Sequence, residues 1–301
     1  MTFVKARLLI TVCCLLSSFG AHAASVNYRV ATWNLEWLTD EPVERIETSK
    51  RTRQDVAKLA DYAKQLNADI IAFQEVESVT VAEKVFGTQY QIYLSDRAQD
   101  PFRQNQFDSG NQYTGFAIRR GIDVEDLGDI RLEANPKSRL RFASYLIIAP
   151  QSKTPIHALA VHLKAGCSGA FKQRRECEKL KEQGHHIHSW IQQRQRAHHQ
   201  YLILGDFNHN LAYRGDWLWN IMISDYPATL LTKHTKAKCQ VRSNRHPTKL
   251  HQFRSLIDHM IVSEGFNTQQ KASQLIYLRQ DVLDYRLSDH CPVFIDLPFN
   301  H

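Results

Sequence analysis

The chain has 301 residues, of which 43% are hydrophobic and 23% are charged, and its formal net charge is +7. This balance is typical of a globular protein and excludes collagen-like, coiled-coil and largely disordered chains. The length accommodates one large domain or two small ones, and the basic excess indicates an anionic partner without specifying a fold.

The first 23 residues have the pattern of a secretory signal peptide. Lys5 and Arg7 precede an apolar stretch over residues 8–19, and residues 21–23 (AHA) form a small-x-small cleavage site. The stretch is shorter than the roughly 20 apolar residues that a membrane-spanning helix needs. We therefore expect an exported, periplasmic or extracellular protein whose mature chain, residues 24–301, has no transmembrane segment. Removal of two basic residues and no acidic ones lowers the net charge to +5.

Export places the cysteines in an oxidising compartment, where disulfides form. Four cysteines remain in the mature chain, and four cysteines allow three connectivities. We favour a bond between Cys167 and Cys177, because it closes a short loop, which leaves Cys239 to pair with Cys291. Zinc binding is the alternative, but no C-x-x-C or H-x-x-x-H spacing supports it.

The mature chain alternates strand-like and helix-like segments and contains no repeats or Pro/Gly-rich linkers. Strands are predicted at residues 28–34, 70–73, 113–119, 144–149, 156–164, 201–206, 256–263 and 291–297. Apolar residues at helical spacing predict a helix over residues 52–66 that ends at Asn67, and residues 171–196 form a long, polar, helix-rich segment. These elements predict a single α/β domain.

A basic, acid-free segment extends from Tyr226 to Ile257. Its poor periodicity predicts a long loop, and it leads directly into Asp258. Solvated surface charge is one explanation of the segment. The other is contact with substrate phosphates, because cationic side chains neutralise them. On the second explanation we expect Arg245 and Lys249 to bind substrate.

Several predicted strands end in polar, chelating or titratable residues. Each of these residues has a structural explanation on its own, such as a turn or a helix cap. Together they indicate a site, because the ends of neighbouring strands lie side by side. Carboxylates and amides suit a hard cation such as Mg²⁺, and a histidine beside an aspartate suits acid–base chemistry. The set comprises Asn34, Glu75, His162, Asp206, Asn208, Asp258, Asp289 and His290.

Six segments, in this order, carry a family resemblance: ATWNLEWL, IIAFQEV, VHLKAGC, ILGDFNHN, SLIDHMIV and RLSDHCPVFIDL. They resemble the endonuclease/exonuclease/phosphatase superfamily, the DNase I-like group, over roughly residues 26–298. The GDFN and SDH motifs carry the resemblance because they are specific together. It implies an α/β fold that is a four-layer αββα sandwich, with two packed mixed β-sheets flanked by helices.

The resemblance also implies roles for individual residues. Glu75 is the principal Mg²⁺ ligand, with Asn34 beside it and Asp289 close to the ion; Mn²⁺ and Ca²⁺ are alternative ions. Asp206 orients or deprotonates the attacking water, and Asn208 holds the scissile phosphate. His290 contacts a phosphate oxygen, and Asp258 pairs with His290. His162 is a second catalytic histidine, and Tyr113 is a phosphate contact.

The resemblance thus implies metal-assisted hydrolysis of a phosphodiester by in-line attack of water. The basic segment favours a nuclease that hydrolyses DNA, with RNA as a second candidate substrate. We expect a monomer. A sphingomyelinase or phospholipase C-like enzyme is the alternative, for which residues 217–219 (WLW) are the one candidate membrane contact; they fit a buried helix start better. A non-catalytic binding protein of the same fold is the weaker alternative, because the site residues are all retained.

Overall fold

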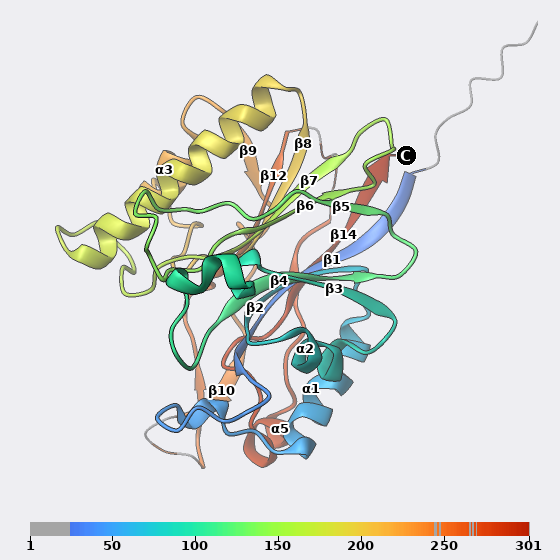
Figure 1. The fold of residues 1–301 in the computed structure, drawn as a ribbon, viewed down its shortest axis with the longest axis vertical. Coiled ribbons are helices and arrows are strands. Elements are labelled where there is room, and N and C mark those ends of the chain that lie inside the picture. The colour runs from blue at the N-terminus through green and yellow to red at the C-terminus, as the bar shows by residue number, and fades with distance from the viewer. Residues whose placement is uncertain are drawn as a thin grey trace, which may run out of the picture.

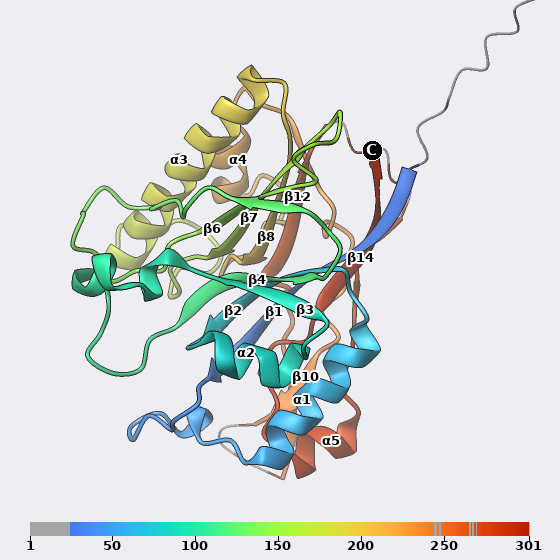
Figure 2. The same cartoon turned by 45° about the vertical axis from the view of Figure 1, so that its right-hand side comes forward.

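The computed structural model describes residues 25–300 except 244, 245, 247, 265, 267 and 269. Two six-stranded β-sheets pack face to face, and helices cover the outer face of each sheet (Figures 1 and 2). The four-layer αββα sandwich that the resemblance implied is therefore confirmed. The proposed signal peptide, residues 1–23, lies outside the described residues.

The first sheet contains both ends of the described chain. Strand β1 pairs in parallel with β2 and antiparallel with β14, so that Ser25 lies opposite Asn300. In spatial order the strands are β13 (Ser273–Gln274), β14 (Val293–Asn300), β1 (Ser25–Leu38), β2 (Ile70–Val76), β4 (Tyr113–Arg119) and β3 (Tyr90–Leu94).

The second sheet has a parallel pair, β7 and β8, at its centre and antiparallel neighbours on either side. In spatial order the strands are β5 (Val124–Asp126), β6 (Ser144–Ile148), β7 (Ile156–His162), β8 (Gln200–Asp206), β12 (Asp258–Ser263) and β9 (Ala228–Leu230). A separate two-stranded hairpin consists of β10 (Gln240–Arg242) and β11 (Leu250–Gln252).

The period-two alternation of the strands divides their side chains between two cores. In β1, Val30 faces the second sheet, whereas Ala31 and Trp33 face the helices on the outside. Burial of both faces explains why the central strands read as nearly continuous apolar runs. Helices α1 (Arg53–Leu66), α2 (Val79–Phe86) and α5 (Arg279–Asp284) cover the first sheet, and α3 (Arg175–Arg196) and α4 (Trp217–Ile223) cover the second. Short 3-10 helices are η1 (Glu47–Ser49), η2 (Asp96–Ala98) and η3 (Asp100–Asn105).

Local chemistry explains where the first helix begins and ends. The Thr52 side chain accepts a hydrogen bond from the Asp55 backbone, and the Asp55 side chain accepts one from the Thr52 backbone. This capping box satisfies two N–H groups that the first turn would leave free. Asn67 takes a left-handed conformation at the other end, with φ of 44°. The predicted helix and its predicted stop are both confirmed.

The acid-free segment is less irregular than its sequence pattern indicated. It contains strands β9, β10 and β11, so the prediction of a continuous long loop is wrong. Each of these strands has only three residues, which is too short for a period-two pattern to stand out. Within the described part of the chain, no helix has both the length and the apolar character needed to cross a membrane.

Gly205 lies where β8 approaches β7 most closely, one residue before Asp206. Its φ is +148°, and a Cβ built there would lie 1.9 Å from the Val161 carbonyl oxygen. We expect Gly205→Ala to destabilise the fold by roughly 2–4 kcal/mol, because backbone strain and overpacking add. Urea unfolding measures this loss. Gly121→Ala is the matched control, because Gly121 has φ +97° but no atom within 4 Å, so it should lose less. Equal losses would contradict the steric explanation.

Candidate active site

Eight of the predicted site residues converge at one edge of the sandwich. Strands β1, β2, β7 and β8 run toward this edge, whereas β12 and β14 begin there because they are antiparallel to β8 and β1. In the second sheet, His162 and Asp258 lie opposite Asp206 on either side. The eight residues that meet are Asn34, Glu75, His162, Asp206, Asn208, Asp258, Asp289 and His290.

Asp206 lies at the centre of the cluster. Its Oδ2 accepts a hydrogen bond from Asn34 Nδ2 at 3.0 Å, and its Oδ1 accepts one from the Asn208 backbone N–H at 2.7 Å. The Nε2 atoms of His162 and His290 lie 3.5 and 3.8 Å from Asp206 Oδ2. Burial, and to a lesser degree the Asp258 carboxylate, raises the pKa of Asp206 to about 7. A carboxyl group with this pKa can exchange a proton near neutral pH.

Glu75 is held by three donors. Asn34 Nδ2 binds its Oε1 at 3.1 Å, the Trp37 backbone N–H binds its Oε2 at 3.1 Å, and the Gln112 amide also donates to Oε2. The Glu75 backbone has φ of 60°, which is an uncommon conformation for a residue with a side chain. Asn208 has a similar φ of 52°. Strained residues cluster at functional sites, and both of these belong to the predicted set.

His290 and Asp258 form an ion pair beside Asp206. His290 Nδ1 lies 2.9 Å from Asp258 Oδ2, and its Nε2 faces the Asp206 and Asp289 carboxylates at 3.8 and 3.7 Å. Burial alone would lower the pKa of His290, but the Asp258, Asp289 and Asp206 carboxylates raise it well above its ordinary value. His290 is therefore a cation at neutral pH.

The two site histidines differ in charge. Burial, together with the positive charge of Arg141, lowers the pKa of His162 well below its ordinary value, so its ring is neutral. Its Nδ1 is buried and has no hydrogen-bond partner among the described residues. Arg141 Nη2 donates to the Leu163 carbonyl at 3.0 Å, next to His162 in the chain. The neutral imidazole of His162 and the imidazolium of His290 therefore both lie beside the Asp206 carboxylate.

Arg141 and Gln112 are functional residues that were not predicted from the sequence. Arg141 precedes the predicted strand at residues 144–149, but several other arginines precede strands as well. Gln112 precedes another predicted strand and bears no charge. Only the packing of their loops against the edge distinguishes them. Glu36 was also missed: its Oε2 accepts the Asp289 backbone N–H at 2.9 Å.

Three predicted substrate contacts are not among the eight residues of the cluster. Tyr113 begins β4, is only 5% exposed, and packs under the Arg97 guanidinium at 5.1 Å. Lys249 is exposed in the β10–β11 hairpin, where its backbone N–H donates to the His246 carbonyl at 2.8 Å. Arg245 lies outside the described residues. These three roles remain predictions.

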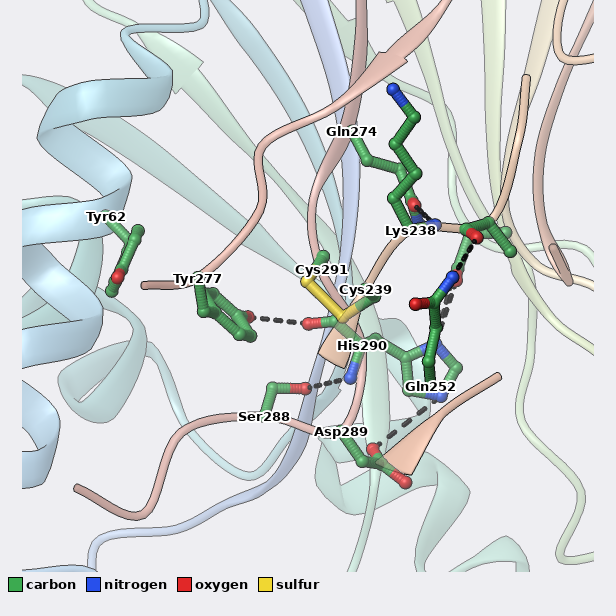
Figure 3. Close-up of a disulfide and its surroundings, with 12 residues drawn as sticks. Tyr62, Lys238, Cys239, Gln252, Gln274, Tyr277, Ser288, Asp289, His290 and Cys291 are labelled. Carbon is green, nitrogen blue, oxygen red and sulfur yellow. Dashed lines mark hydrogen bonds and ion pairs between the residues drawn. A yellow bond between two sulfur atoms is a disulfide. The ribbon is translucent and has the colours of Figure 1, made fainter. Parts of the chain in front are cut away.

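Both predicted disulfides are present. Cys167 is bonded to Cys177, and Cys239 is bonded to Cys291, the residue after His290. Figure 3 shows the second disulfide beside the segment that holds His290. There, the Tyr277 hydroxyl donates to the His290 carbonyl at 2.6 Å, and the His290 backbone N–H donates to Ser288 Oγ at 3.0 Å. The bond thus links the hairpin segment to the edge where the eight predicted site residues meet, which we call the catalytic edge.

Removal of this disulfide has an expected cost in both stability and activity. We expect the double variant Cys239→Ser, Cys291→Ser to lose about 2–4 kcal/mol of stability. The disulfide joins residues with a sequence separation of 52, and without it the unfolded chain gains conformational entropy. Urea unfolding measures the loss of stability, and hydrolysis rates measure the loss of activity. The matched variant Cys167→Ser, Cys177→Ser opens a separation of only 10 residues and should lose less stability. The reverse order of stabilities would contradict this account.

The side chains at the edge fit a hard divalent cation. Ligand atoms of Asp206, Asp258 and His290 lie within 4.8 Å of one another. Glu75 and Asp289, predicted as ligands, add further carboxylates to the same edge, and Asn34 adds an amide. Oxygen-rich sets of this kind bind Mg²⁺ or Mn²⁺ rather than soft metals.

Comparisons with known proteins agree with the fold. The sequence profile of the Endonuclease/Exonuclease/phosphatase family matches residues 31–290. A family protein from Bacteroides thetaiotaomicron is 14% identical with a TM-score of 0.61, over 92% of this chain and 99% of that one. Truncated TDP2 from Caenorhabditis elegans is 17% identical with a TM-score of 0.57, over 91% of this chain and 98% of that one. A mannosyl-6-phosphatase from B. thetaiotaomicron is 15% identical with a TM-score of 0.58, over 90% of this chain and all of that one. No curated protein sequence matches the chain.

A two-sheet sandwich with carboxylates and histidines at one edge is the arrangement expected of a hydrolytic phosphoesterase. The profile match covers most of the chain, and the chain belongs to the Endonuclease/Exonuclease/phosphatase family. Enzymes of this family are typically dependent on a divalent metal ion, in agreement with the acidic and histidine cluster.

Proposed function

We propose that this protein is a Mg²⁺-dependent phosphodiester hydrolase that acts as a nuclease on DNA, with RNA as a second substrate. The observation that carries the proposal is the arrangement around Asp206, whose Oδ2 lies within 3.8 Å of both His162 and His290. A carboxylate that can accept a proton, next to a cationic imidazole, can activate water and neutralise a phosphoryl oxygen at the same edge.

The proposed roles follow from charge and contact. Asp206 orients the attacking water and takes its proton. The His290 imidazolium binds a phosphoryl oxygen, and Asp258 keeps the ring cationic and aligned. Asn208 Nδ2 now donates to the Leu163 carbonyl at 3.1 Å and would turn toward the scissile phosphate. Attack is in line, and no covalent enzyme intermediate forms. Glu75, with Asn34 and Asp289 beside it, would hold Mg²⁺, which supplies further stabilisation of the developing charge; Mn²⁺ and Ca²⁺ are alternatives.

Nucleic acid is the favoured substrate because the basic, acid-free segment of residues 226–257 leads directly into Asp258. The lipid alternative depends on residues 217–219 as a membrane contact. Leu218 is fully buried and Trp217 Nε1 donates to the Gly169 carbonyl at 2.9 Å, so these side chains belong to the α4 packing surface, as predicted. The binding-protein alternative is disfavoured, because the acid–base and carboxylate residues are retained and brought together.

We also propose an exported, monomeric catalytic domain spanning residues 24–301. Two disulfides support export, because such bonds persist in oxidising compartments.

A substrate panel tests the proposal. The purified mature protein is incubated with Mg²⁺, with or without EDTA, on plasmid DNA, RNA, sphingomyelin, mannose 6-phosphate and bis(p-nitrophenyl) phosphate. We expect EDTA-sensitive cleavage of plasmid and of the chromogenic diester. We also expect the plasmid rate to fall steeply with salt, because phosphate contacts release counterions. Efficient cleavage of sphingomyelin or of the sugar phosphate with inert plasmid would overturn the proposal.

A further inference from the structure

A cavity of about 460 Å³ opens beside Glu75. Trp37 and Gln112 line it, and both donate hydrogen bonds to the Glu75 carboxylate. Arg141 also lines it and donates to the Leu163 carbonyl, the oxygen that accepts from Asn208 Nδ2. The cavity therefore leads directly to the catalytic edge.

The lining of this cavity is strongly cationic. Seven lysine and arginine residues line it, against one acidic residue, Glu133, which is already paired with Lys179. Buried Arg97 donates to the Asn105 and Gln112 carbonyls at 2.8 and 2.9 Å, so it holds the loops together. In addition to Arg97 and Arg141, the lining cations that form no ion pair with any described carboxylate are Lys137, Arg139, Lys164 and Arg175. We call the cavity with these residues the basic groove.

Arg141 marks the junction between the basic groove and the catalytic edge. Its Nε is buried and has no hydrogen-bond partner among the described residues. A buried donor without a partner costs free energy that a bound acceptor would recover. A guanidinium suits phosphate in particular, because its planar array of donors matches phosphate oxygens. The unpartnered donor and the unpaired cations beside it point to the same ligand, an anion with more than one negative charge.

The other side of the catalytic edge has a different character. A cavity of about 560 Å³ lies beside Asp289, and its acidic lining also includes Glu36 and Glu47. Both arginines in its lining already bind other groups of the protein. Arg242 Nη2 donates to the Leu283 carbonyl at 2.6 Å, and Arg286 Nη2 pairs with Glu47 at 3.1 Å. Among the described residues, the basic groove is therefore lined by more cations without an ion pair than this second cavity.

An exposed aromatic ring at the groove favours a nucleic acid strand over a simple polyanion as the ligand. Phe107 lines the groove and is 47% exposed, with the Arg139 guanidinium 5.2 Å from its ring centroid. Exposed aromatic rings among cations are typical of surfaces that bind single strands, where the ring stacks on a base.

We propose that the basic groove binds the phosphodiester backbone of a nucleic acid strand on one side of the scissile phosphate. This proposal rests on the proposed nuclease function. Lys137, Arg139 and Arg175 contact phosphates beyond the scissile one, and Phe107 stacks on a neighbouring base. The groove thus determines substrate affinity, whereas the catalytic edge determines the chemistry.

Charge reversal with a matched control tests the groove. The groove variant carries Lys137→Glu, Arg139→Glu and Arg175→Glu, all at exposed positions without ion pairs among the described residues. The control carries Lys233→Glu, Lys236→Glu and Arg254→Glu, exposed positions in the acid-free segment. For a single-stranded oligonucleotide we expect the groove variant to raise KM about tenfold or more and to reduce the salt slope of log(kcat/KM) by about 2 to 3. Its rate on bis(p-nitrophenyl) phosphate should stay within about twofold of wild type, because that substrate has no neighbouring phosphate.

The outcomes separate the groove from the nuclease function. Wild-type hydrolysis of the chromogenic diester with inert DNA and RNA would defeat the nuclease function. Oligonucleotide cleavage with unchanged KM and salt slope in the groove variant would defeat the groove proposal alone, as would a larger loss in the control variant. A third arm uses phosphatidylserine vesicles: binding that depends on the groove, with unaltered oligonucleotide cleavage, would show that the groove serves an anionic membrane and overturn the proposal.

Discussion

Glu75→Gln is expected to lower hydrolysis of every substrate by about a thousandfold or more while the fold stays intact. Glutamine has nearly the same shape as glutamate and can still accept the hydrogen bond from the Trp37 backbone N–H. It lacks the negative charge that would hold the metal ion, and such an ion supplies several kcal/mol of transition-state stabilisation. Rates on the chromogenic diester across a range of Mg²⁺ concentrations measure the loss, and urea unfolding confirms that the variant is folded.

Glu83→Gln is the matched control for this prediction. Glu83 is an exposed carboxylate on α2, away from the catalytic edge, so its removal changes the net charge by the same amount. The control should retain the wild-type rate and Mg²⁺ dependence. A Glu75→Gln variant that retains more than about a tenth of the wild-type rate would show that another residue carries the metal-binding role.

The sequence predicts this site well because its residues sit at strand ends. Apolar runs such as residues 70–73 identify the buried strands, and the register of a parallel pair places His162 directly opposite Asp206. The family motifs then supply the order of the strands. The predicted pairing of Asp258 with His290 needs only that β12 and β14 begin at this edge, and the two side chains lie 2.9 Å apart.

The basic groove could not be predicted in the same way. Its cations come from segments far apart in the chain, among them the loop that contains Arg139 and the start of α3 at Arg175. The charge runs in these segments are short, such as KQRR at residues 172–175, whereas the acid-free segment is long. Charge density along the sequence therefore pointed to Lys249, while the fold gathers unpaired cations on the other side of the edge. Hydrogen bonds to backbone carbonyls also occupy the N–H donors of Arg242, which no sequence pattern reveals.

His290→Ala is expected to lower kcat/KM by about a hundredfold to a thousandfold, because it removes a cation from the phosphoryl oxygens. The pH dependence follows from the charge of the ring. The nearby carboxylates raise the pKa of His290 well above its ordinary value, so the imidazolium persists through neutral pH and is lost as the pH rises through that raised pKa. The wild-type advantage over the alanine variant should therefore be largest at neutral pH and should narrow in alkaline solution.

Two further variants make this prediction specific. Asp258→Asn removes the carboxylate 2.9 Å from His290 Nδ1, lowers the pKa of His290, and should shift the alkaline fall in kcat/KM to lower pH. His185→Ala, at an exposed position on α3, is the control and should keep both the rate and the pH profile of the wild type. If the ratio of wild-type to His290→Ala rates were constant with pH, His290 would act without its charge, through shape or as a neutral hydrogen-bond donor.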